Sequence, residues 1–445
     1  MSKKSKPIVA IVGRPNVGKS ALFNAIVGKR ISIVEDTPGV TRDRIYADTS
    51  WLNYEFTLID TGGIEPESKD IIFSQMREQA QIAIDMADVI LFVVDIQSGL
   101  QDADGKVADM LRKSQRPVVL TVNKVDQPVE MQPYVYEFYN LGIGDPIPVS
   151  AVNRTGIGDL LDVVVSYFPE DAGNGEDEED NAVRIAIIGK PNVGKSSIVN
   201  RLIGENRVIV SEIPGTTRDA IDTRVRHDGK DYIFTDTAGL RRQKKISGDL
   251  EYYMMVRAVA AVERSDMAMV VIDATQGVAE QDAKIAGIAH DRGKAVIIAV
   301  NKWDAVTKDT NTMNEFSAQI RRTLSFIPYA EILYISALTG QRMNRIYAEV
   351  DKVSESQNIQ IATGTLNEVL TEAEVMQQPP ADKGKMLRIY YGTQTGVKPP
   401  TFVLFVNDKK LMHFSYLRYL ENQIRKTFGL VGTPIKFIIR ERNEE

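Results

Sequence analysis

The sequence predicts an α/β protein in which two tandem P-loop domains precede a small C-terminal α+β domain. Short apolar runs alternate with amphipathic stretches, which is the pattern of a mostly parallel sheet flanked by helices. One set of motifs occurs twice in the same order, and this repetition ends near residue 350. We therefore predict a first domain at residues 1–168, an acidic linker at 169–181, a second domain at 182–352 and a C-terminal domain at 353–445.

The composition limits the class of protein. The chain has 445 residues, 43% of them hydrophobic and 26% charged, which is enough for about three domains of roughly 150 residues. It contains no cysteine and only three histidines, which argues against disulfides, iron–sulfur clusters and thiolate zinc sites. No apolar run approaches the ~20 residues needed to cross a bilayer. The apolar stretch after the N-terminal lysines is too short for a signal peptide. We expect a cytoplasmic protein and a monomer, although the sequence itself gives no oligomeric state.

Charge is distributed unevenly along the chain. Residues 1–166 carry 17 basic and 22 acidic side chains, residues 182–350 carry 24 and 20, and residues 381–445 carry 12 and 6. Seven acids and no bases occupy residues 167–181, which is typical of a flexible, self-repelling linker. The basic C-terminal end indicates a polyanionic partner.

Each predicted domain has its own order of elements. The first copy contains the strand candidates IVAIV, FTLID, VILFVVD, VVLTVN and IPVS. The repeated motifs follow the carboxyl ends of these runs, where open α/β sheets bind ligands. After the repeats we predict a helix at Leu366–Met376, strands at MLRIYY and TFVLFV, a helix at Phe414–Phe428 and a strand at Ile435–Ile439. This α-β-β-α-β order predicts a small two-layer domain.

The first repeated motif is the P-loop pattern GxxxxGK[ST] after an apolar strand. Its glycines let backbone amides surround a phosphate, and the next helix directs its positive N-terminus at that phosphate. The lysine would reach the β- and γ-phosphates, and the serine would place a hydroxyl on Mg²⁺. The residues are Gly13, Arg14, Pro15, Asn16, Val17, Gly18, Lys19 and Ser20 in the first copy, and Gly189, Lys190, Pro191, Asn192, Val193, Gly194, Lys195 and Ser196 in the second, offset by 176.

The second repeated motif, DxxG, ends the next apolar strand. Its carboxylate can hold magnesium, and its last glycine can offer an amide to the γ-phosphate. A turn without a ligand is the alternative, and it explains two copies in the same order poorly. The motif consists of Asp60, Thr61, Gly62 and Gly63, followed by Ile64, and of Asp236, Thr237, Ala238 and Gly239, followed by Leu240, again offset by 176.

The NKxD motif predicts the base. Its carboxylate can accept hydrogen bonds from N1–H and the exocyclic amine of guanine, whereas adenine offers no donor at N1. The asparagine would support the base edge or the loop, the lysine would pack along the ring, and a later Ser-Ala pair would give an amide to the guanine carbonyl. These residues are Asn123, Lys124, Val125, Asp126, Ser150 and Ala151, and Asn301, Lys302, Trp303, Asp304, Ser336 and Ala337. The sequence therefore predicts GTP as the nucleotide.

These motifs together resemble the Der/EngA family of double-GTPase ribosome-assembly proteins, which belongs to the TRAFAC class of GTPases. The resemblance covers nearly the whole chain, including the acidic linker and the C-terminal module. It implies a KH-like C-terminal domain, GTP and GDP with Mg²⁺ as ligands, and GTP hydrolysis. It also implies a role in assembly of the large ribosomal subunit, with the ribosome and ribosomal RNA as partners.

Hydrolysis is expected to be slow and controlled by switch segments. Ile64 and Leu240 occupy the position after DxxG where small GTPases carry the glutamine that orients water. In some relatives with such a hydrophobic residue, the P-loop asparagine helps to bind potassium, so we hypothesise potassium stimulation through Asn16 and Asn192. A loop-shaping turn is the alternative role for these asparagines. The candidate switch threonines, which close onto magnesium, are Thr41 and Thr217, the latter with Thr216 as a competitor.

Several features leave alternatives open. The basic C-terminal residues are interleaved with Phe402, Tyr416 and Tyr419, which fits RNA binding or an ordinary surface over core aromatics. The GxxG string at 429–432 follows a helix and precedes a strand, so we interpret it as a turn. For the whole chain, a GTPase switch is the leading hypothesis. A non-catalytic nucleotide-gated scaffold and a metabolic P-loop kinase are the alternatives.

Overall fold

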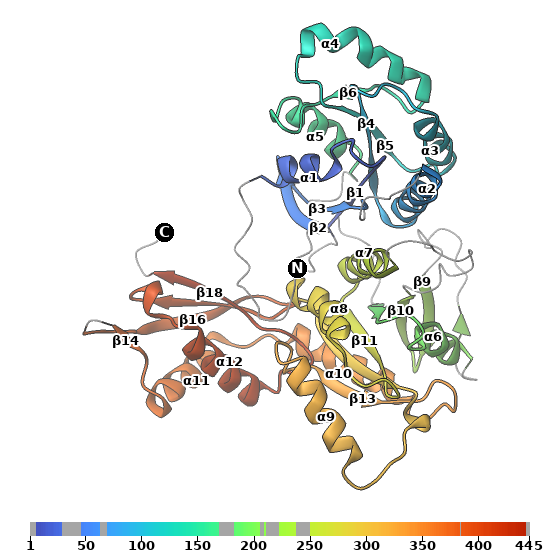
Figure 1. Ribbon diagram of the computed structural model, residues 1–445. Helices are drawn as coiled ribbons and strands as arrows, with labels where there is room; N and C mark the ends of the chain where they lie inside the picture. The colour runs from blue at the N-terminus through green and yellow to red at the C-terminus, as the bar shows by residue number, and fades with distance from the viewer. Residues whose placement is uncertain are drawn as a thin grey trace.

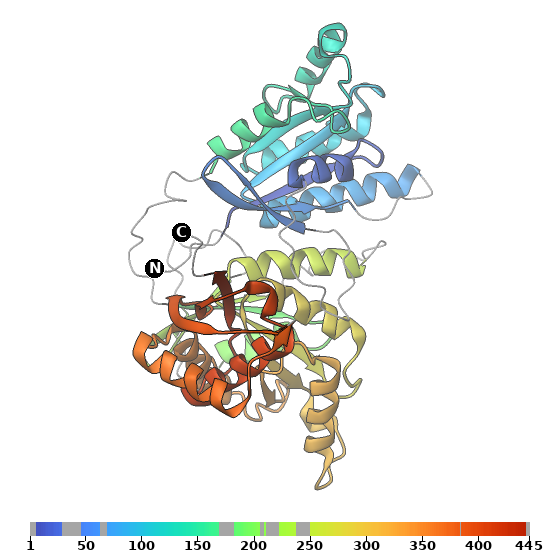
Figure 2. The same cartoon turned by 90° about the vertical axis from the view of Figure 1, so that its left-hand side faces the viewer.

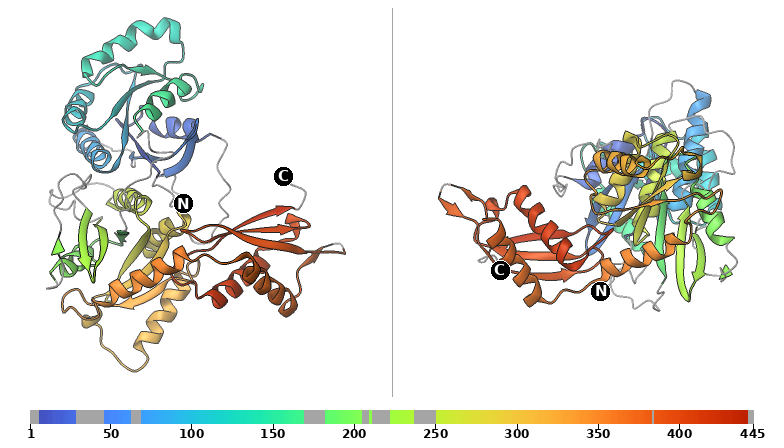
Figure 3. Two further views of the ribbon diagram at one scale, coloured as in Figure 1. Left: turned by 180° about the vertical axis from the view of Figure 1, so that it is seen from behind. Right: turned by 90° about the horizontal axis from the view of Figure 1, so that it is seen from below.

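The computed structural model describes residues 6–28, 46–62, 69–168, 182–204, 209–210, 222–236, 250–382 and 384–441. These residues form three units: a first unit from β1 to α5, a second unit from β7 to α10, and a C-terminal unit from α11 to β18 (Figure 1). The second unit lies between the other two, and the C-terminal unit projects to one side of it (Figures 2 and 3). Within the described ranges, no helix combines the length and apolar content that a bilayer span requires.

The first unit is a six-stranded sheet in the order β2-β3-β1-β4-β5-β6. Only the β2–β3 pair is antiparallel. The central strand β4 is buried along its whole length because helices cover both faces of the sheet. The strands are β1 Ile8–Gly13, β2 Tyr46–Trp51, β3 Tyr54–Asp60, β4 Val89–Asp95, β5 Val118–Asn123 and β6 Ile147–Pro148, and the helices are α1 Lys19–Val27, α2 Lys69–Met86, α3 Asp102–Lys113, α4 Pro128–Val135, the 3₁₀ helix η1 Tyr136–Leu141 and α5 Ile157–Ser166.

The second unit repeats this architecture in a seven-stranded sheet ordered β13-β12-β11-β7-β10-β9-β8. Strands β11 and β12 are buried throughout, as their apolar sequences require. The strands are β7 Val183–Ile188, β8 Ile209–Val210, β9 Asp222–His227, β10 Lys230–Asp236, β11 Met267–Asp273, β12 Ala295–Asn301 and β13 Glu331–Tyr334, and the helices are α6 Lys195–Ile203, α7 Leu250–Glu263, α8 Glu280–Asp291, η4 Trp303–Ala305, α9 Thr312–Thr323 and α10 Arg345–Asn358.

The C-terminal unit packs helices α11 and α12 with a three-stranded sheet in the order β16-β17-β18, in which β17 and β18 are parallel. A two-stranded ribbon, β14-β15, precedes this sheet. The elements α11, β16, β17, α12 and β18 confirm the predicted α-β-β-α-β order, and α12 has the predicted bounds. The predicted strand MLRIYY does not form one strand, because β15 ends at Met386 and β16 begins at Ile389. The elements are α11 Thr363–Met376, β14 Ala381–Asp382, β15 Lys385–Met386, β16 Ile389–Gly396, β17 Thr401–Val406, η5 Lys409–Leu411, α12 Phe414–Phe428 and β18 Lys436–Glu441. With the two parallel-dominated sheets, this confirms the predicted fold class.

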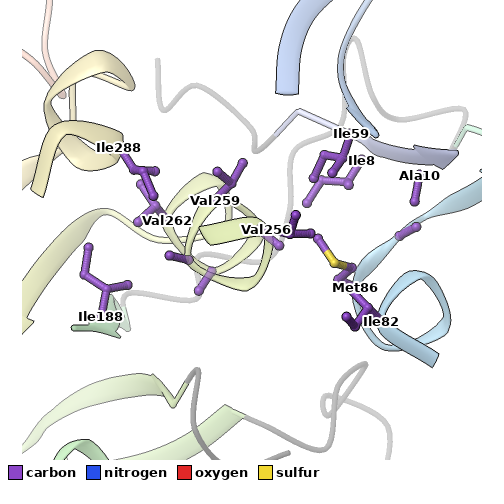
Figure 4. Packing of buried hydrophobic residues seen from close by; sticks show 14 of the residues in the cluster. Ile8, Ala10, Ile59, Ile82, Met86, Ile188, Val256, Val259, Val262 and Ile288 are labelled. Atoms are coloured by element: carbon purple, nitrogen blue, oxygen red, sulfur yellow. The ribbon is translucent and has the colours of Figure 1, made fainter. Parts of the chain in front are cut away.

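The first and second units share one apolar cluster (Figure 4). Helices α2 and α7 contact each other, and Met86 of α2 lies beside Val256 of α7. Two arginines of the second unit complete the junction. Arg264 donates to the Met86 carbonyl oxygen at 2.7 Å. Arg292 is 7% exposed and lies between Asp48 of the first unit and Glu263 of the second. The contact therefore joins the helices that follow the two DxxG motifs.

The second and C-terminal units are joined through backbone hydrogen bonds. The amide of Val296 donates to the carbonyl of Gly432 at 2.7 Å, and the amide of Gly432 donates to the carbonyl of Tyr329 at 2.9 Å. The Arg425 guanidinium lies 5.1 Å from the centroid of the Tyr329 ring. A Cβ at Gly432 would come within 2.3 Å of a Val353 methyl. The GxxG string is a turn, as predicted, and it forms this junction.

The domain limits drawn from the sequence stay predictions. Helix α10 continues past residue 352 to Asn358, and Val353 belongs to the core of the second unit. The proposed division at 352/353 therefore falls within a helix. The acidic linker at 169–181 lies outside the described residues.

Candidate nucleotide-binding sites

Each P-loop forms a tight turn between the first strand of its unit and the next helix. Helix α1 begins at Lys19 after Gly18, which has φ of 91°, and α6 begins at Lys195 after Gly194, which has φ of 99°. Glycine adopts this left-handed conformation without strain. Asn16 and Asn192 are also left-handed, with φ of 66° and 63°, a conformation that asparagine tolerates better than most residues. Both loops therefore present a helix N-terminus, the feature that binds anions.

The P-loop lysines point into their own loops. The ammonium of Lys19 donates to the carbonyls of Gly13 and Arg14 at 2.9 and 2.7 Å. Lys195 makes the same pair of bonds, to Gly189 and Lys190, at 2.6 and 2.7 Å. Both side chains are buried, at 8% and 5% exposure. Each loop thus encircles a buried cation, which suits it to a phosphate group.

The NKxD asparagines connect two loops of each site. The Asn123 amide donates to the Val17 carbonyl at 2.8 Å, and its oxygen accepts from the amide of Ala151 at 3.1 Å. Asn301 joins the corresponding loops of the second unit at 2.8 and 3.0 Å. Of the two roles left open by the sequence, the structure shows loop support. A Cβ at Gly18 would come within 2.3 Å of the Asn123 amide nitrogen, so the glycine makes room for this bridge.

The DxxG aspartate of the first unit lies beside the P-loop serine. The Ser20 hydroxyl donates to Asp60 Oδ2 at 3.0 Å, and the Gly62 amide donates to Oδ1 at 2.9 Å. Burial raises the pKa of Asp60 above its ordinary value, although these bonds and Lys19 oppose the increase. A hydroxyl and a carboxylate at this spacing are the hard oxygen donors that Mg²⁺ prefers. The residues present therefore fit a magnesium ion.

The aspartates predicted to recognise the base are exposed at the carboxyl edge of each sheet. Asp126 follows β5, and Asp304 lies in η4 just after β12. The Ser150 hydroxyl donates to Asp126 Oδ1 at 2.6 Å. The predicted Ser-Ala residue and the predicted acid are thus brought together. An exposed carboxylate with one oxygen anchored leaves the other available to a donor edge of a base.

Two further acids at each site were not singled out from the sequence. Asp95 binds Lys124 at 2.8 Å, and Asp273 binds Lys302 at 2.6 Å. Burial acts to raise the pKa of Asp273, but Lys302 and hydrogen bonds from Thr275 outweigh it, so the pKa lies below its ordinary value. These acids hold the NKxD lysines in place. The repeat offset could have revealed them, because 273−95 equals the 178 that separates the NKxD motifs.

A second pair of acids, one on α3 and one on α8, forms ion pairs with the second residue of each P-loop. Arg14 donates to Asp104 at 2.7 Å, and Lys190 lies 2.9 Å from Asp282. Both carboxylates are fully buried. Burial raises the pKa of Asp104 and of Asp282, with the paired cation opposing the increase. The second residue of each P-loop therefore ties the loop to the neighbouring helix. The two aspartates are separated by 282−104, which is again 178.

Some predicted contact residues have side chains that face the core. The Thr61 hydroxyl donates to the Ile11 carbonyl at 2.5 Å and is fully buried. Val17, Val193, Val125 and Trp303 are at most 2% exposed. Only their backbones are available to a ligand. The following predicted residues lie outside the described ranges: Thr41, Gly63, Ile64, Thr216, Thr217, Thr237, Ala238, Gly239 and Leu240.

The C-terminal aromatics singled out for RNA are internal. Phe402 is fully buried, Tyr416 is 3% exposed, and the Tyr419 hydroxyl donates to the Ala373 carbonyl at 3.0 Å. Arg425 binds the carbonyls of its own turn, and Lys398 contacts Asp266 of the second unit. Packing within the unit therefore accounts for these aromatic side chains, and RNA binding by the unit stays a prediction.

Comparison with known proteins identifies the family. A family model described as 50S ribosome-binding GTPase matches residues 8–124 and 184–302, and one described as the C-terminal KH-domain-like region of EngA bacterial GTPase enzymes matches residues 360–440. GTPase Der of Agathobacter rectalis is 67% identical over 440 residues, which are 99% of each chain. GTPase Der of Lachnospira eligens is 65% identical over 441 residues, 99% of this chain and 100% of the relative.

The chain belongs to the GTPase Der family. It is therefore a GTPase with two GTPase domains in tandem and a KH-like C-terminal domain. GTP, GDP and Mg²⁺ are the ligands that this membership implies. The site geometry agrees with that chemistry: in each GTPase domain a P-loop, a DxxG aspartate and an NKxD aspartate meet at one edge of a parallel sheet.

Proposed function

We propose that this GTPase is a nucleotide-controlled switch that acts in the cytoplasm in assembly of the large ribosomal subunit, with the ribosome and its RNA as partners. The observation that carries the proposal is the union, in one chain, of two complete GTPase motif sets with a KH-like unit. That unit is joined to the second GTPase domain by backbone hydrogen bonds. A matching family is described as ribosome-binding. Two NKxD motifs, which serve base recognition rather than an acceptor substrate, suit a switch better than a kinase.

The site residues are assigned roles by their positions. In the first domain we assign phosphate binding to the P-loop amides and Lys19, guanine recognition to Asp126, and magnesium coordination to Ser20, Asp60 and Thr41. In the second domain Lys195, Asp304, Ser196, Asp236 and Thr217 take these roles. Magnesium held by these residues would supply positive charge that offsets the negative charge of the phosphates. Gly63 and Gly239 would offer amides to the γ-phosphate.

Intrinsic hydrolysis is proposed to be slow and stimulated by potassium. A hydrophobic side chain after DxxG, Ile64 or Leu240, cannot orient the attacking water. Asn16 and Asn192 lie on the exposed side of the P-loops, where an amide oxygen can coordinate a monovalent cation. Turnover is compared in potassium and sodium chloride at equal ionic strength. Equal rates would reject the potassium role and leave these asparagines with the loop-shaping role.

The switch is tested on ribosomal particles. The full chain is sedimented with large-subunit precursors in GTP, in a non-hydrolysable analogue and in GDP. We expect association in the GTP states and release in GDP, and we expect Lys19→Ala and Lys195→Ala to weaken the association. Single-turnover hydrolysis on the same samples distinguishes a GTPase switch from a non-catalytic scaffold. Equal association in GTP, in the analogue and in GDP would contradict the proposal.

A further inference from the structure

Exposed apolar side chains are concentrated at the far end of the first GTPase domain. Val129, Tyr134, Tyr136 and Tyr139 are 90%, 64%, 58% and 47% exposed. They belong to α4 and η1, at the end of this domain opposite the second domain (Figures 1 and 3). Single exposed apolar residues are ordinary, whereas a concentration of them marks an interaction surface. We call these four residues with Glu130 and Glu137 the α4–η1 face.

Helical periodicity places three of these side chains, those of Val129, Tyr136 and Tyr139, on one side of the segment. Phe138 and Leu141 are buried and hold η1 on the core. Val129 and Tyr136 are two helical turns apart, and Tyr136 and Tyr139 are one 3₁₀ turn apart, so all three share a side. The rings of Tyr136 and Tyr139 stack, with centroids 6.2 Å apart and planes at 18°. The result is an ordered aromatic platform.

The negative charge around this platform favours a positively charged partner. Residues 127–146 contain three acids, Glu130, Glu137 and Asp145, and no lysine or arginine. All three acids are exposed, and the Tyr139 hydroxyl donates to Asp145 at 3.1 Å. Phosphates of RNA would be repelled here. Ammonium and guanidinium groups are attracted both by the carboxylates and by the faces of the rings.

The second GTPase domain does not repeat this surface. Its helix α9 lies between β12 and β13, as α4 lies between β5 and β6, and it ends in Arg321 and Arg322. The fold alone therefore does not require an aromatic and acidic surface at this position. Residues 305–330 of the second copy carry three basic and two acidic side chains, whereas residues 127–146 of the first copy carry only acidic ones. This difference in charge at the same place indicates different partners.

We propose that the α4–η1 face binds a lysine- and arginine-rich segment of a polypeptide. The basic side chains lie over the rings of Tyr136 and Tyr139 while the neighbouring carboxylates neutralise their charge. The proposal rests on the proposed function only for the source of the segment, which would be a protein of the ribosomal particle.

The probe is a fluorescent peptide of about 20 residues, in which lysine and arginine alternate with serine and glycine, titrated with the full chain at about 0.1 M salt. We expect Tyr136→Ser with Tyr139→Ser to weaken binding about tenfold, since two exposed cation–π contacts are lost. Tyr136→Phe with Tyr139→Phe keeps the ring faces and is expected to bind within twofold of the parent chain. Tyr167→Ser is the matched control, because Tyr167 is 50% exposed on the same domain outside the face.

Two results would overturn the inference. One is equal peptide binding by the serine variant and the parent, which would reduce the binding to general electrostatics. The other is tighter binding of a single-stranded RNA of equal length that the serine variant loses. The same variants are sedimented with ribosomal particles in GTP. If the parent chain does not sediment with the particles, the proposed function is rejected while the peptide result still stands. The two failures are therefore distinguishable.

Discussion

Replacing Asn123 by alanine tests whether one side chain holds the first nucleotide site together. The asparagine is 2% exposed and bridges the P-loop and the Ser-Ala loop. Alanine would leave the Val17 carbonyl and the Ala151 amide without their partner. An unpaired buried polar group costs about 1–3 kcal/mol. Relaxation of the loops and entry of water reduce the sum, so we expect a net cost of about 2–4 kcal/mol.

Part of this cost should appear as lost nucleotide affinity. The bridge aligns the phosphate-binding loop with the base-binding loop, so a nucleotide that contacts both must restore their alignment on binding. If about 2 kcal/mol falls on the bound state, the Kd for GTP rises about thirtyfold. The assay is titration with a fluorescent GTP analogue in a Lys195→Ala background, which isolates the first site. Thermal unfolding reports the remaining cost.

The second GTPase domain contains the equivalent asparagine, which provides a matched comparison. Asn301→Ala in a Lys19→Ala background should weaken the second site by a similar factor, because Asn301 makes the same two bonds. Asn140→Ala changes an exposed asparagine of the same domain and should leave binding within twofold. Parent-like affinity in the Asn123→Ala variant would refute the role of the bridge.

Arg292→Ala leaves the 7% exposed carboxylate of Glu263 without its cation, and we expect the two GTPase domains to separate. Small-angle scattering should then give a larger radius of gyration than the parent chain. Gly432→Ala places a methyl against Val353 at a residue with φ of 68°, which should cost about 1–3 kcal/mol in urea unfolding. Adding Val353→Ala should recover part of that loss relative to the Val353→Ala single variant. Burial lowers the pKa of His290 below 6.5, so the unfolded chain binds more protons and stability falls as the pH drops below about 6.5. His290→Asn should flatten the dependence of the unfolding temperature on pH in that window.

The sequence predicts buried elements well because burial on both faces leaves a continuous apolar run. The run VILFVVD is β4 without a change of bounds. The edge strand β2 has the sequence YADTSW and was not predicted. One side of an edge strand faces solvent, so its polar residues give no apolar run. Helix α10 likewise ends beyond the predicted domain limit, because its last turns pack on the second core through Val353.

The residues of the nucleotide sites likewise fall into those that the sequence predicts and those that it does not. Motifs of consecutive residues, such as the P-loop, can be predicted from the sequence because the backbone itself forms the site. The carboxylates that support them are contributed from distant positions. Asp104 lies 90 residues after Arg14, and Asp95 lies 29 residues before Lys124. Nothing in the local sequence marks such a pair, since its meaning depends on which strand ends are adjacent in the sheet.

The two junctions between units differ in the bonds that a movement must break. At Gly432 the second and C-terminal units share backbone hydrogen bonds, and Tyr329 is 7% exposed beneath Arg425. Separation there would break these main-chain hydrogen bonds, so we expect these two units to move together. The first GTPase domain is held to the second by an apolar contact and by Arg264 and Arg292. Among the described residues, the hydrogen bonds of this junction are made by arginine side chains, which can change partner without a movement of the backbone. The first domain is therefore the part of the molecule that a change at either nucleotide site can displace most easily.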